Sequence, residues 1–338
     1  MQSFRGYGMT GRRLRLVQWG TKHAHARGWL EVILSNRDIE LVGLVEEDPE
    51  RRRQLEAMGE APWNEVVWID HPEEILGNDQ IDAFVVEGDN LENLDQAEAV
   101  IRAGHHLLLD KPAGHDYPRW KKVLEEAAER ERYVQLGYMF RHHDGYQRIG
   151  GWAREGLLGD VFAMSAHMPT YADPLPHKQF AEFAGGVFYD LCGHVLDQIV
   201  WVLGRPSRVR SFMQRVVPTS GFVDNGVAVL EYPNAMAIVT ISGLVVSPRP
   251  RRYEVYGTRG WAIMEPMEPA QTVRLALDEA RGGYQAGEQV IQLEARPRYD
   301  ASLQAFVCTL RNEQTPDRTL EHERIVQETV LRASGAMK

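Results

Sequence analysis

Residues Leu14–Trp19 read LRLVQW, and the chain then passes through GTKHAH at 20–25 into a segment whose apolar residues recur at helical spacing. Short apolar runs of the same kind return at 39–45 and 81–86, with helical patterns between them. Strands that alternate with helices are typical of βαβ units, in which the strands form a parallel sheet. We therefore expect an α/β domain in the first part of the chain.

The pattern changes after Arg141. A helix is expected at 188–203, because Gly204 and Pro206 follow it as a helix stop. Runs rich in β-formers then follow one another directly, at 208–217, 226–232, 236–242, 252–257, 261–264 and 272–277. Successive strands of this kind indicate an α+β domain with a large, mostly antiparallel open sheet. The sequence thus predicts two domains, 1–137 and 138–338.

The composition excludes several classes of protein. Of the 338 residues, 48 are Asp or Glu and 38 are Lys or Arg, which leaves a net charge of −10. This charge repels a phosphate backbone, so we expect no nucleic-acid partner. No stretch approaches the roughly 20 apolar residues that cross a bilayer, so we expect no membrane partner. With two cysteines and no apolar signal-peptide core, a cytoplasmic location is expected.

The turn at 20–25 is the first candidate site. A βαβ unit that binds a dinucleotide needs glycines there, because backbone N–H groups and a helix N-terminus must approach a pyrophosphate. Gly20 stands where the first glycine is needed, whereas Lys22 occupies the position of the second. We take Gly20, Thr21, Lys22 and His23 as candidate cofactor contacts. An ordinary strand-to-helix turn remains the alternative.

An acidic residue ends the second apolar run. Glu46 follows Gly20 by about the spacing at which a carboxylate binds ribose hydroxyls. It would repel a 2′-phosphate, and Arg51 and its neighbours lie further along the next helix, so we expect NAD rather than NADP. Asp48 and Pro49 read equally well as the cap and first residue of that helix. The two interpretations are compatible.

A lysine follows the strand expected at 106–109. Asp110-Lys111-Pro112 stands at the carboxyl end of that strand, the edge where ligands bind in open α/β sheets. A lysine held there away from water can act in acid–base chemistry. An exposed loop lysine is the alternative.

Two titratable residues share a face of the helix at 188–203. Asp190 and His194 are four residues apart, so the carboxylate can orient the imidazole and raise its basicity. This arrangement suits a general base that removes a hydroxyl proton. A half-buried helix whose histidine completes a hydrogen-bond network is the alternative.

These sites, in this order, resemble the Gfo/Idh/MocA oxidoreductases from Leu14 to about Ala333. The family's Glu-Lys-Pro is similar to Asp110-Lys111-Pro112, and its Gly-Gly-x-x-x-Asp-x-x-x-His helix matches residues 185–194. The resemblance implies an NAD(P)-binding Rossmann domain followed by a domain that mediates dimer or tetramer contacts. It also implies a polyhydroxylated substrate, such as a sugar or cyclitol, held between the two domains.

The resemblance also implies roles for individual residues. Asn90 is what remains of the family's Thr-Pro-Asn segment, which makes it a cofactor contact alongside Asp110 and Lys111. We expect an NAD-dependent dehydrogenase for a secondary alcohol, or for the matching ketone in reverse, with His194 as the base or Lys111 in its place. The candidates that face the substrate are Arg141, Tyr171, His177 and Lys178.

Two other functions remain open at this point. A barrel-type metal hydrolase could use His23 and His25 as ligands, joined by His194 or the His142-His143 pair. A non-catalytic dinucleotide-binding regulator should lack a lysine and histidine pair, which this chain has. We expect the dehydrogenase, with no metal.

Self-association is expected from the second domain. Apolar residues alternate along its strands, for example at Val227, Val229 and Ile238, which gives a sheet with two faces. Its helices can cover only one of them. An uncovered apolar face predicts a homodimer or homotetramer.

Overall fold

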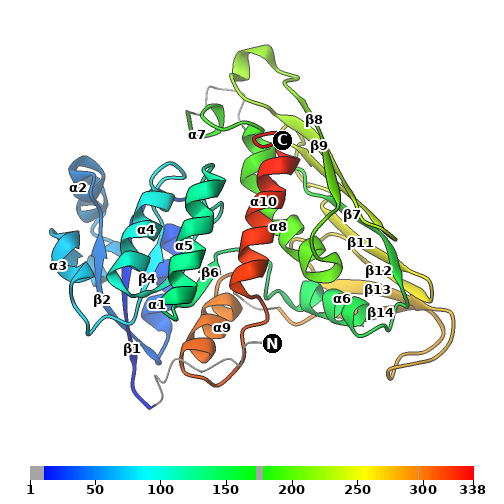
Figure 1. The fold of residues 1–338 in the computed structure, drawn as a ribbon, viewed down its shortest axis with the longest axis horizontal. Coiled ribbons are helices and arrows are strands. Elements are labelled where there is room, and N and C mark those ends of the chain that lie inside the picture. The colour runs from blue at the N-terminus through cyan, green and yellow to red at the C-terminus, as the bar shows by residue number, and fades with distance from the viewer. Residues whose placement is uncertain (1–10, 173–177, 296) are drawn as a thin grey trace. The chain divides into compact units, whose positions relative to one another are not determined.

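The protein is described by a computed structural model that covers residues 11–172, 178–295 and 297–338 (Figure 1). The chain divides into two compact units. The first contains Met1–Gly137 and Pro297–Arg324, and the second contains Tyr138–Arg296 and Ile325–Lys338. The chain passes to the second unit after Gly137, returns to the first unit at Pro297 and enters the second unit again at Ile325. No helix within the described residues is long and apolar enough to span a membrane.

The first unit is built on a parallel sheet in the strand order β3-β2-β1-β4-β5-β6. Its strands are β1 (Leu14–Trp19), β2 (Ile39–Val45), β3 (Trp68–Ile69), β4 (Ala83–Val86), β5 (His106–Leu109) and β6 (Val134–Leu136). The connecting helices are α1 (Ala26–Ser35), α2 (Pro49–Met58), η1 (Trp63–Glu65), α3 (Pro72–Leu76), α4 (Asn93–Ala103) and α5 (Tyr117–Glu129). This is the doubly wound Rossmann order, which confirms the predicted fold and places the topological switch point between β1 and β4.

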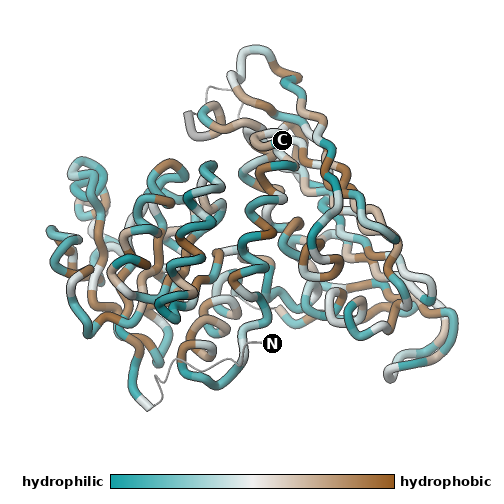
Figure 2. Tube along the Cα trace, in the orientation of Figure 1, coloured by the Kyte–Doolittle hydropathy of each residue, from teal (hydrophilic) through white to brown (hydrophobic). Residues whose placement is uncertain are grey.

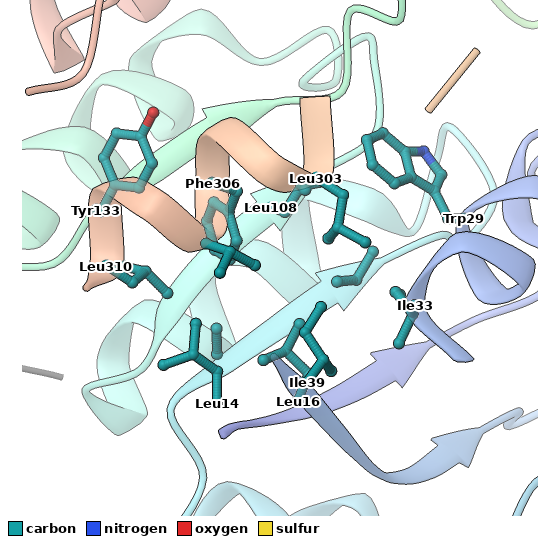
Figure 3. Close-up of a cluster of buried hydrophobic side chains, with 13 residues drawn as sticks. Leu14, Leu16, Trp29, Ile33, Ile39, Leu108, Tyr133, Leu303, Phe306 and Leu310 are labelled. Atoms are coloured by element: carbon teal, nitrogen blue, oxygen red, sulfur yellow. The ribbon is translucent and has the colours of Figure 1, made fainter. Parts of the chain in front are cut away.

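The core of the first unit is completed by a helix from the end of the chain. Helix α9 (Asp300–Leu310) buries Leu303, Phe306 and Leu310 against Leu14 and Leu108 of the sheet. Figure 3 shows these side chains of α9 meeting those of the strands and of α1. Each fully buried leucine or phenylalanine contributes roughly 1.5–3 kcal/mol, so α9 stabilises this unit strongly. The sequence pattern had grouped this helix with 138–338, because chain order does not show which sheet a late helix covers.

The second unit contains an eight-stranded sheet in the order β14-β13-β12-β11-β7-β10-β9-β8. Only β7 and β10 pair in parallel, so the expected, mostly antiparallel sheet is confirmed. The strands are β7 (Val161–His167), β8 (Arg208–Gln214), β9 (Asn225–Glu231), β10 (Met236–Ser242), β11 (Arg252–Gly257), β12 (Gly260–Met264), β13 (Thr272–Leu277) and β14 (Gly287–Gln292). The described strands form two open sheets rather than a βα barrel, which removes the structural basis of the hydrolase alternative.

Helices cover one face of this second sheet. Helix α8 (Gly186–Leu203) packs on β7, β9 and β10, and α6 (Asp144–Arg154) packs on β11. The short α7 (Lys178–Ala181) packs against α8, and the unit also contains η2 (Pro218–Ser220) and the later part of α10 (Leu320–Ala333). Buried Ala237 and Val239 of β10 alternate with Met236 and Ile238, which are 50% and 40% exposed. Figure 2 shows strands of mixed hydropathy in this sheet and hydrophobic strands in the first. The outer face is thus partly apolar, and no described helix covers it.

Candidate active site

The turn after β1 comes close to the turn after β4. Gly20 has a φ of +96°, and a Cβ on it would lie 2.5 Å from the backbone nitrogen of Gly88. A glycine is therefore required at the first position of the turn. The two later glycine positions hold Lys22 and His25, and the Lys22 Nζ forms an ion pair with Glu92 at 2.6 Å.

Glu46 lies at the end of β2, as the sequence predicts, and is buried. Its carboxylate accepts hydrogen bonds from the Thr21 backbone nitrogen at 3.1 Å, the Thr21 hydroxyl at 2.5 Å and the Asp48 backbone nitrogen at 2.9 Å. Asp48 caps α2 and Pro49 begins it, so the two interpretations of this segment hold together. Glu46 thereby ties the end of β2 to the turn after β1.

Arg51 reaches this site, although the sequence placed it too far along the helix to matter. Its Nε donates to the Thr21 hydroxyl at 2.6 Å and lies 3.9 Å from the nearer carboxylate oxygen of Glu46. Helix α2 begins directly after Asp48, so its first turn still faces the strand ends. The positive charge of Arg51 therefore partly neutralises the negative charge of Glu46.

Two asparagines lie close to the start of α4, with Asn90 in the loop after β4 and Asn93 as the first residue of the helix. Asn90 is 2% exposed, and its Oδ1 has no hydrogen-bond partner within the described part of the chain. Asn93, which the sequence analysis did not select, is fully buried, and neither its oxygen nor its nitrogen has a partner there. Orphaned polar atoms are rare in folded proteins and indicate a missing partner. Together with the close approach at Gly20, they fit a dinucleotide at the switch point.

Asp110 and Lys111 follow β5, and both are buried. The Lys111 backbone nitrogen donates to Asp110 Oδ1 at 2.6 Å, and the Lys111–Pro112 peptide bond is cis. Because β4 and β5 are parallel neighbours, this pair emerges at the same edge of the sheet as Asn90. The lysine is therefore no exposed loop residue.

Asp110 is also the centre of a cluster that the sequence analysis missed. Its Oδ2 lies 3.1 Å from His23 Nδ1, 2.9 Å from His25 Nδ1 and 3.1 Å from Trp29 Nε1. Glu87, which follows β4 directly, places its Oε2 3.7 Å from His23 Nδ1. The available signal was that each polar residue stands just beyond a strand end, but the pairing needs the order β1-β4-β5.

Burial and charge set the protonation of this cluster. Burial raises the pKa of Glu87 well above its usual value, and the neighbouring charge of Asp110 adds to the effect. Burial also opposes ionisation of Asp110, but His23 and His25 outweigh it and hold its pKa well below the usual value. Burial lowers the pKa of His25 despite the attraction of Asp110. The surroundings therefore favour ionisation of Asp110 and disfavour ionisation of Glu87 as long as nothing neutralises its charge.

In the second unit, α8 carries Asp190 and His194 one turn apart, as the sequence predicts. His194 is 1% exposed and meets the edges of two aromatic rings, with centroid distances of 5.9 Å to Tyr138 and 5.3 Å to Phe140. Gly193 is needed beside it, because a Cβ there would lie 2.6 Å from the ring of Tyr138. Aromatic packing thus fixes the part of α8 that carries His194.

The four candidate substrate residues differ in their surroundings. Arg141 is 1% exposed, and its Nε and Nη2 donate to the Asp197 carboxylate at 3.2 and 2.7 Å. Tyr171 is half exposed and pairs with Leu244 through an isolated β-bridge. Lys178 begins α7, and His177 lies outside the described residues. The ion pair of Arg141 shows that this residue helps to hold α8.

Comparisons with known proteins agree with both units. A family model described as "Oxidoreductase family, NAD-binding Rossmann fold" matches residues 14–138, and one for the "GFO/IDH/MocA C-terminal domain" matches residues 146–263. The chain is 25% identical over 251 residues to the uncharacterized oxidoreductase YdgJ of Escherichia coli, covering 72% of each chain. It is 21% identical over 253 residues to the myo-inositol 2-dehydrogenase of Thermotoga maritima, covering 72% of this chain and 74% of that one.

A solved structure shares the fold over almost the whole length. It is the UDP-N-acetylglucosamine 3-dehydrogenase GnnA of Acidithiobacillus ferrooxidans, with a TM-score of 0.77 and 19% identity. The similarity covers 97% of this chain and 98% of that one.

Proposed function

Because the chain belongs to the GFO/IDH/MocA family of oxidoreductases, we propose that it transfers a hydride between a nicotinamide dinucleotide and a secondary alcohol or ketone of a sugar, cyclitol or related polyol. The observation that carries this proposal is the edge of the first sheet. The required glycine at 20, the orphaned oxygen of Asn90 and the buried Lys111 all stand at the carboxyl ends of adjacent strands. Relatives that act on an inositol and on a nucleotide sugar support the substrate class.

The residues that would hold the dinucleotide surround the switch point. They are Gly20, Thr21, Lys22, His23, Glu46, Asn90, Asp110 and Lys111, and the orphaned Asn93 joins them. Of the two forms, we propose NAD, because the buried Glu46 carboxylate would accept hydrogen bonds from ribose and repel a 2′-phosphate. The nearby positive charge of Arg51 weakens that repulsion, so the expected preference for NAD over NADP is moderate.

Hydride acceptance and donation are the chemistry that the nicotinamide supplies when bound. In the alcohol-oxidising direction His194 removes the hydroxyl proton, and Asp190 orients the imidazole and stabilises its protonated form. Lys111 donates a hydrogen bond to the substrate oxygen and stabilises negative charge that develops there. In the alternative assignment Lys111 is the base.

Among the substrate candidates, Tyr171, His177 and Lys178 stay as proposed contacts. Arg141 acts by positioning, because its guanidinium is engaged by Asp197, which lies about one turn after His194 on α8. A buried ion pair of this kind is costly to break, since the remaining partner keeps an uncompensated charge.

A binding titration followed by a substrate screen tests the function. NADH and NADPH are titrated against the protein by fluorescence, and sugars, cyclitols and polyols are then screened for NAD(P)H formation. We expect dinucleotide binding and turnover of at least one polyhydroxylated compound. Binding without turnover of any of them would favour the non-catalytic regulator, and no dinucleotide binding would overturn the proposal.

The assembly and location follow from other features. We propose a homodimer or homotetramer formed through the outer face of the second sheet, where Phe212, Met236, Ile238 and Val290 are exposed. A large apolar patch on a surface usually marks an interface. Cys192 and Cys308 form no disulfide, which supports a reducing compartment such as the cytoplasm.

A further inference from the structure

Three loops bring four metal-ligating side chains to one place in the first unit. His23 and His25 lie in the turn after β1, Glu87 directly follows β4, and Asp110 directly follows β5. These strands are neighbours in the parallel sheet, so their carboxyl ends converge. His25 and Glu87 have no part in the proposed hydride transfer.

The ligand atoms are as close as a common ion requires. One atom from each of His23, His25 and Asp110 lies within 4.8 Å of the others, and the closest pairs are 2.9 and 3.1 Å apart. Glu87 Oε2 is 3.7 Å from His23 Nδ1. A tetrahedral ion with bonds of about 2.0–2.2 Å needs ligand atoms about 3.3–3.6 Å apart, so the separations found lie around this range.

Glu87 supplies a second, independent observation. Its side chain is fully buried, and neither carboxyl oxygen forms a hydrogen bond within the described part of the chain. A carboxylic group without such partners is costly in a protein interior. Its oxygen faces the ring of His23, so an ion held by the histidines and Asp110 would give it a partner.

The donor set selects the class of ion. Magnesium and calcium prefer oxygen ligands throughout, whereas two imidazoles with carboxylates suit zinc and similar transition metals. His23, His25 and Asp110 provide three ligands, and Glu87, whose Oε2 lies 3.7 Å from His23 Nδ1, is placed to become the fourth, which would close a tetrahedral site as in structural zinc sites. Trp29 Nε1 donates a hydrogen bond to Asp110 Oδ2, and this bond would fix the orientation of the Asp110 carboxylate as a metal ligand.

We propose that His23, His25, Glu87 and Asp110 bind one divalent transition-metal ion, best matched by zinc, as a structural site in the first unit. From the sequence no metal was expected, because His23 and His25 suggested only a barrel-type hydrolase, which the run of strands after Arg208 disfavours. The ion would join the turn at 20–25 to the ends of β4 and β5, and would fix the backbone that leads into Lys111. A bound ion would engage His23 and Asp110, which are also among the proposed dinucleotide contacts. The inference does not depend on the proposed hydride transfer, since a zinc site can be measured without dinucleotide or substrate.

Metal content and thermal unfolding of the full chain test the site. The protein is stripped with a chelator, dialysed against micromolar zinc, and analysed by mass spectrometry for bound metal. We expect about one zinc ion per chain and a higher melting temperature with zinc than without it, because an ion that binds only the folded state stabilises it. His25→Gln and Glu87→Gln should each reduce the zinc content strongly and remove most of the shift.

An exposed histidine provides the matched control. His71 pairs with Glu73 on the surface, and its side chain is 65% exposed. His71→Gln should keep the full zinc content and the thermal shift. Cobalt offers a readout that survives a loss of stability, because tetrahedral Co²⁺ gives strong visible absorption that should appear in the wild type and disappear in His25→Gln.

Two results would overturn the proposal. One is a stripped wild-type protein that takes up no zinc and shows no cobalt absorption. The other is zinc uptake by correctly folded His25→Gln and Glu87→Gln, judged by circular dichroism, that equals uptake by the wild type.

Discussion

Gly20 and Gly88 lie so close together that a single methyl group on Gly20 would stand 2.5 Å from the backbone nitrogen of Gly88. The contact joins the turns after β1 and β4, which flank the proposed dinucleotide site. The positive φ of Gly20 and the lack of space beside it both disfavour any residue with a side chain at position 20.

Gly20→Ala should therefore weaken both stability and dinucleotide binding. The left-handed backbone alone costs roughly 1–3 kcal/mol for a residue with a Cβ, and the clash with backbone adds to it. Urea unfolding and an NADH titration measure the two effects. Gly59→Ala is the control, because Gly59 ends α2 with a φ of +62° but has open space around it. Equal losses in the two variants would show that the approach to Gly88 has no importance of its own.

Cofactor preference should shift in opposite directions when Glu46 and Arg51 are changed. Glu46→Gln keeps an acceptor for Thr21 but removes the negative charge, so affinity for NADPH should rise by roughly tenfold relative to NADH. Arg51→Gln removes the compensating positive charge and should weaken NADPH more than NADH. Fluorescence titrations at fixed, moderate salt measure both. An unchanged NADH-to-NADPH ratio in Glu46→Gln would contradict the role given to this carboxylate.

The identity of the base can be determined with three variants. His194→Ala should lower kcat by roughly 10²- to 10⁴-fold and remove the acidic limb of the pH profile, while NADH affinity stays nearly unchanged. Asp190→Asn should have a smaller effect, since it only orients the imidazole. If His194→Ala instead keeps both kcat and the acidic limb while Lys111→Met loses them, Lys111 is the base.

Acid should destabilise the first unit through His106. Burial, with Arg132 and His105 nearby, lowers the pKa of His106 to about 3. The unfolded state, with a pKa near 6.5, binds a proton that the folded state rejects, so stability falls as the pH drops from about 6.5 towards 3. The loss is about 1.4 kcal/mol per pH unit, or about 2 kcal/mol at pH 5.

His106→Asn is the variant that isolates this effect. Its oxygen can replace His106 Nδ1, which accepts a hydrogen bond from the Tyr133 backbone nitrogen at 2.9 Å. Urea unfolding at pH 7 and pH 5 should show a smaller acid loss than in the wild type. The exposed His71→Asn should change nothing. Identical acid losses in wild type and His106→Asn would exclude His106 as the cause.

The outer face of the second sheet should control assembly. Ile238→Asp together with Phe212→Asp places charge among its exposed apolar residues and should convert the oligomer to monomers. Sedimentation at micromolar concentration measures the change. Val67→Asp is the control, because Val67 is 68% exposed but lies in the first unit. A wild-type protein that sediments as a 38.5 kDa species would itself contradict the proposed oligomer.

The sequence predicted most elements because their hydrophobic patterns are local. The buried strands β1 and β4 are nearly continuous apolar runs, and Asp190 and His194 share a helix, so their relation follows from helical spacing alone. Strand β14 was missed because it lies at the sheet edge, and its sequence GEQVIQ is mostly polar and exposed. Edge strands need little hydrophobic pattern.

Relations between distant segments could not be predicted in the same way. The cluster of His23, Glu87 and Asp110 depends on which strand lies beside which, and the ion pair of Arg141 with Asp197 joins residues 56 positions apart. A single sequence shows the chemistry of each residue but not its neighbours in space. The role of Arg141 as a substrate contact stays a prediction, and its ion pair with Asp197 could not be predicted.

The late return of the chain to its first unit affects the order of events on the ribosome. Leu14, Leu16 and Leu108 are synthesised long before Leu303 and Phe306, which complete their core. Until α9 emerges, the nascent Rossmann sheet exposes an apolar surface, so its folding cannot finish strictly from the N-terminus onward. A gene fragment that stops at residue 137 would encode this sheet without its covering helix. Expression of the dinucleotide domain alone therefore requires residues 297–324 to be supplied, either fused through a linker or as a separate peptide.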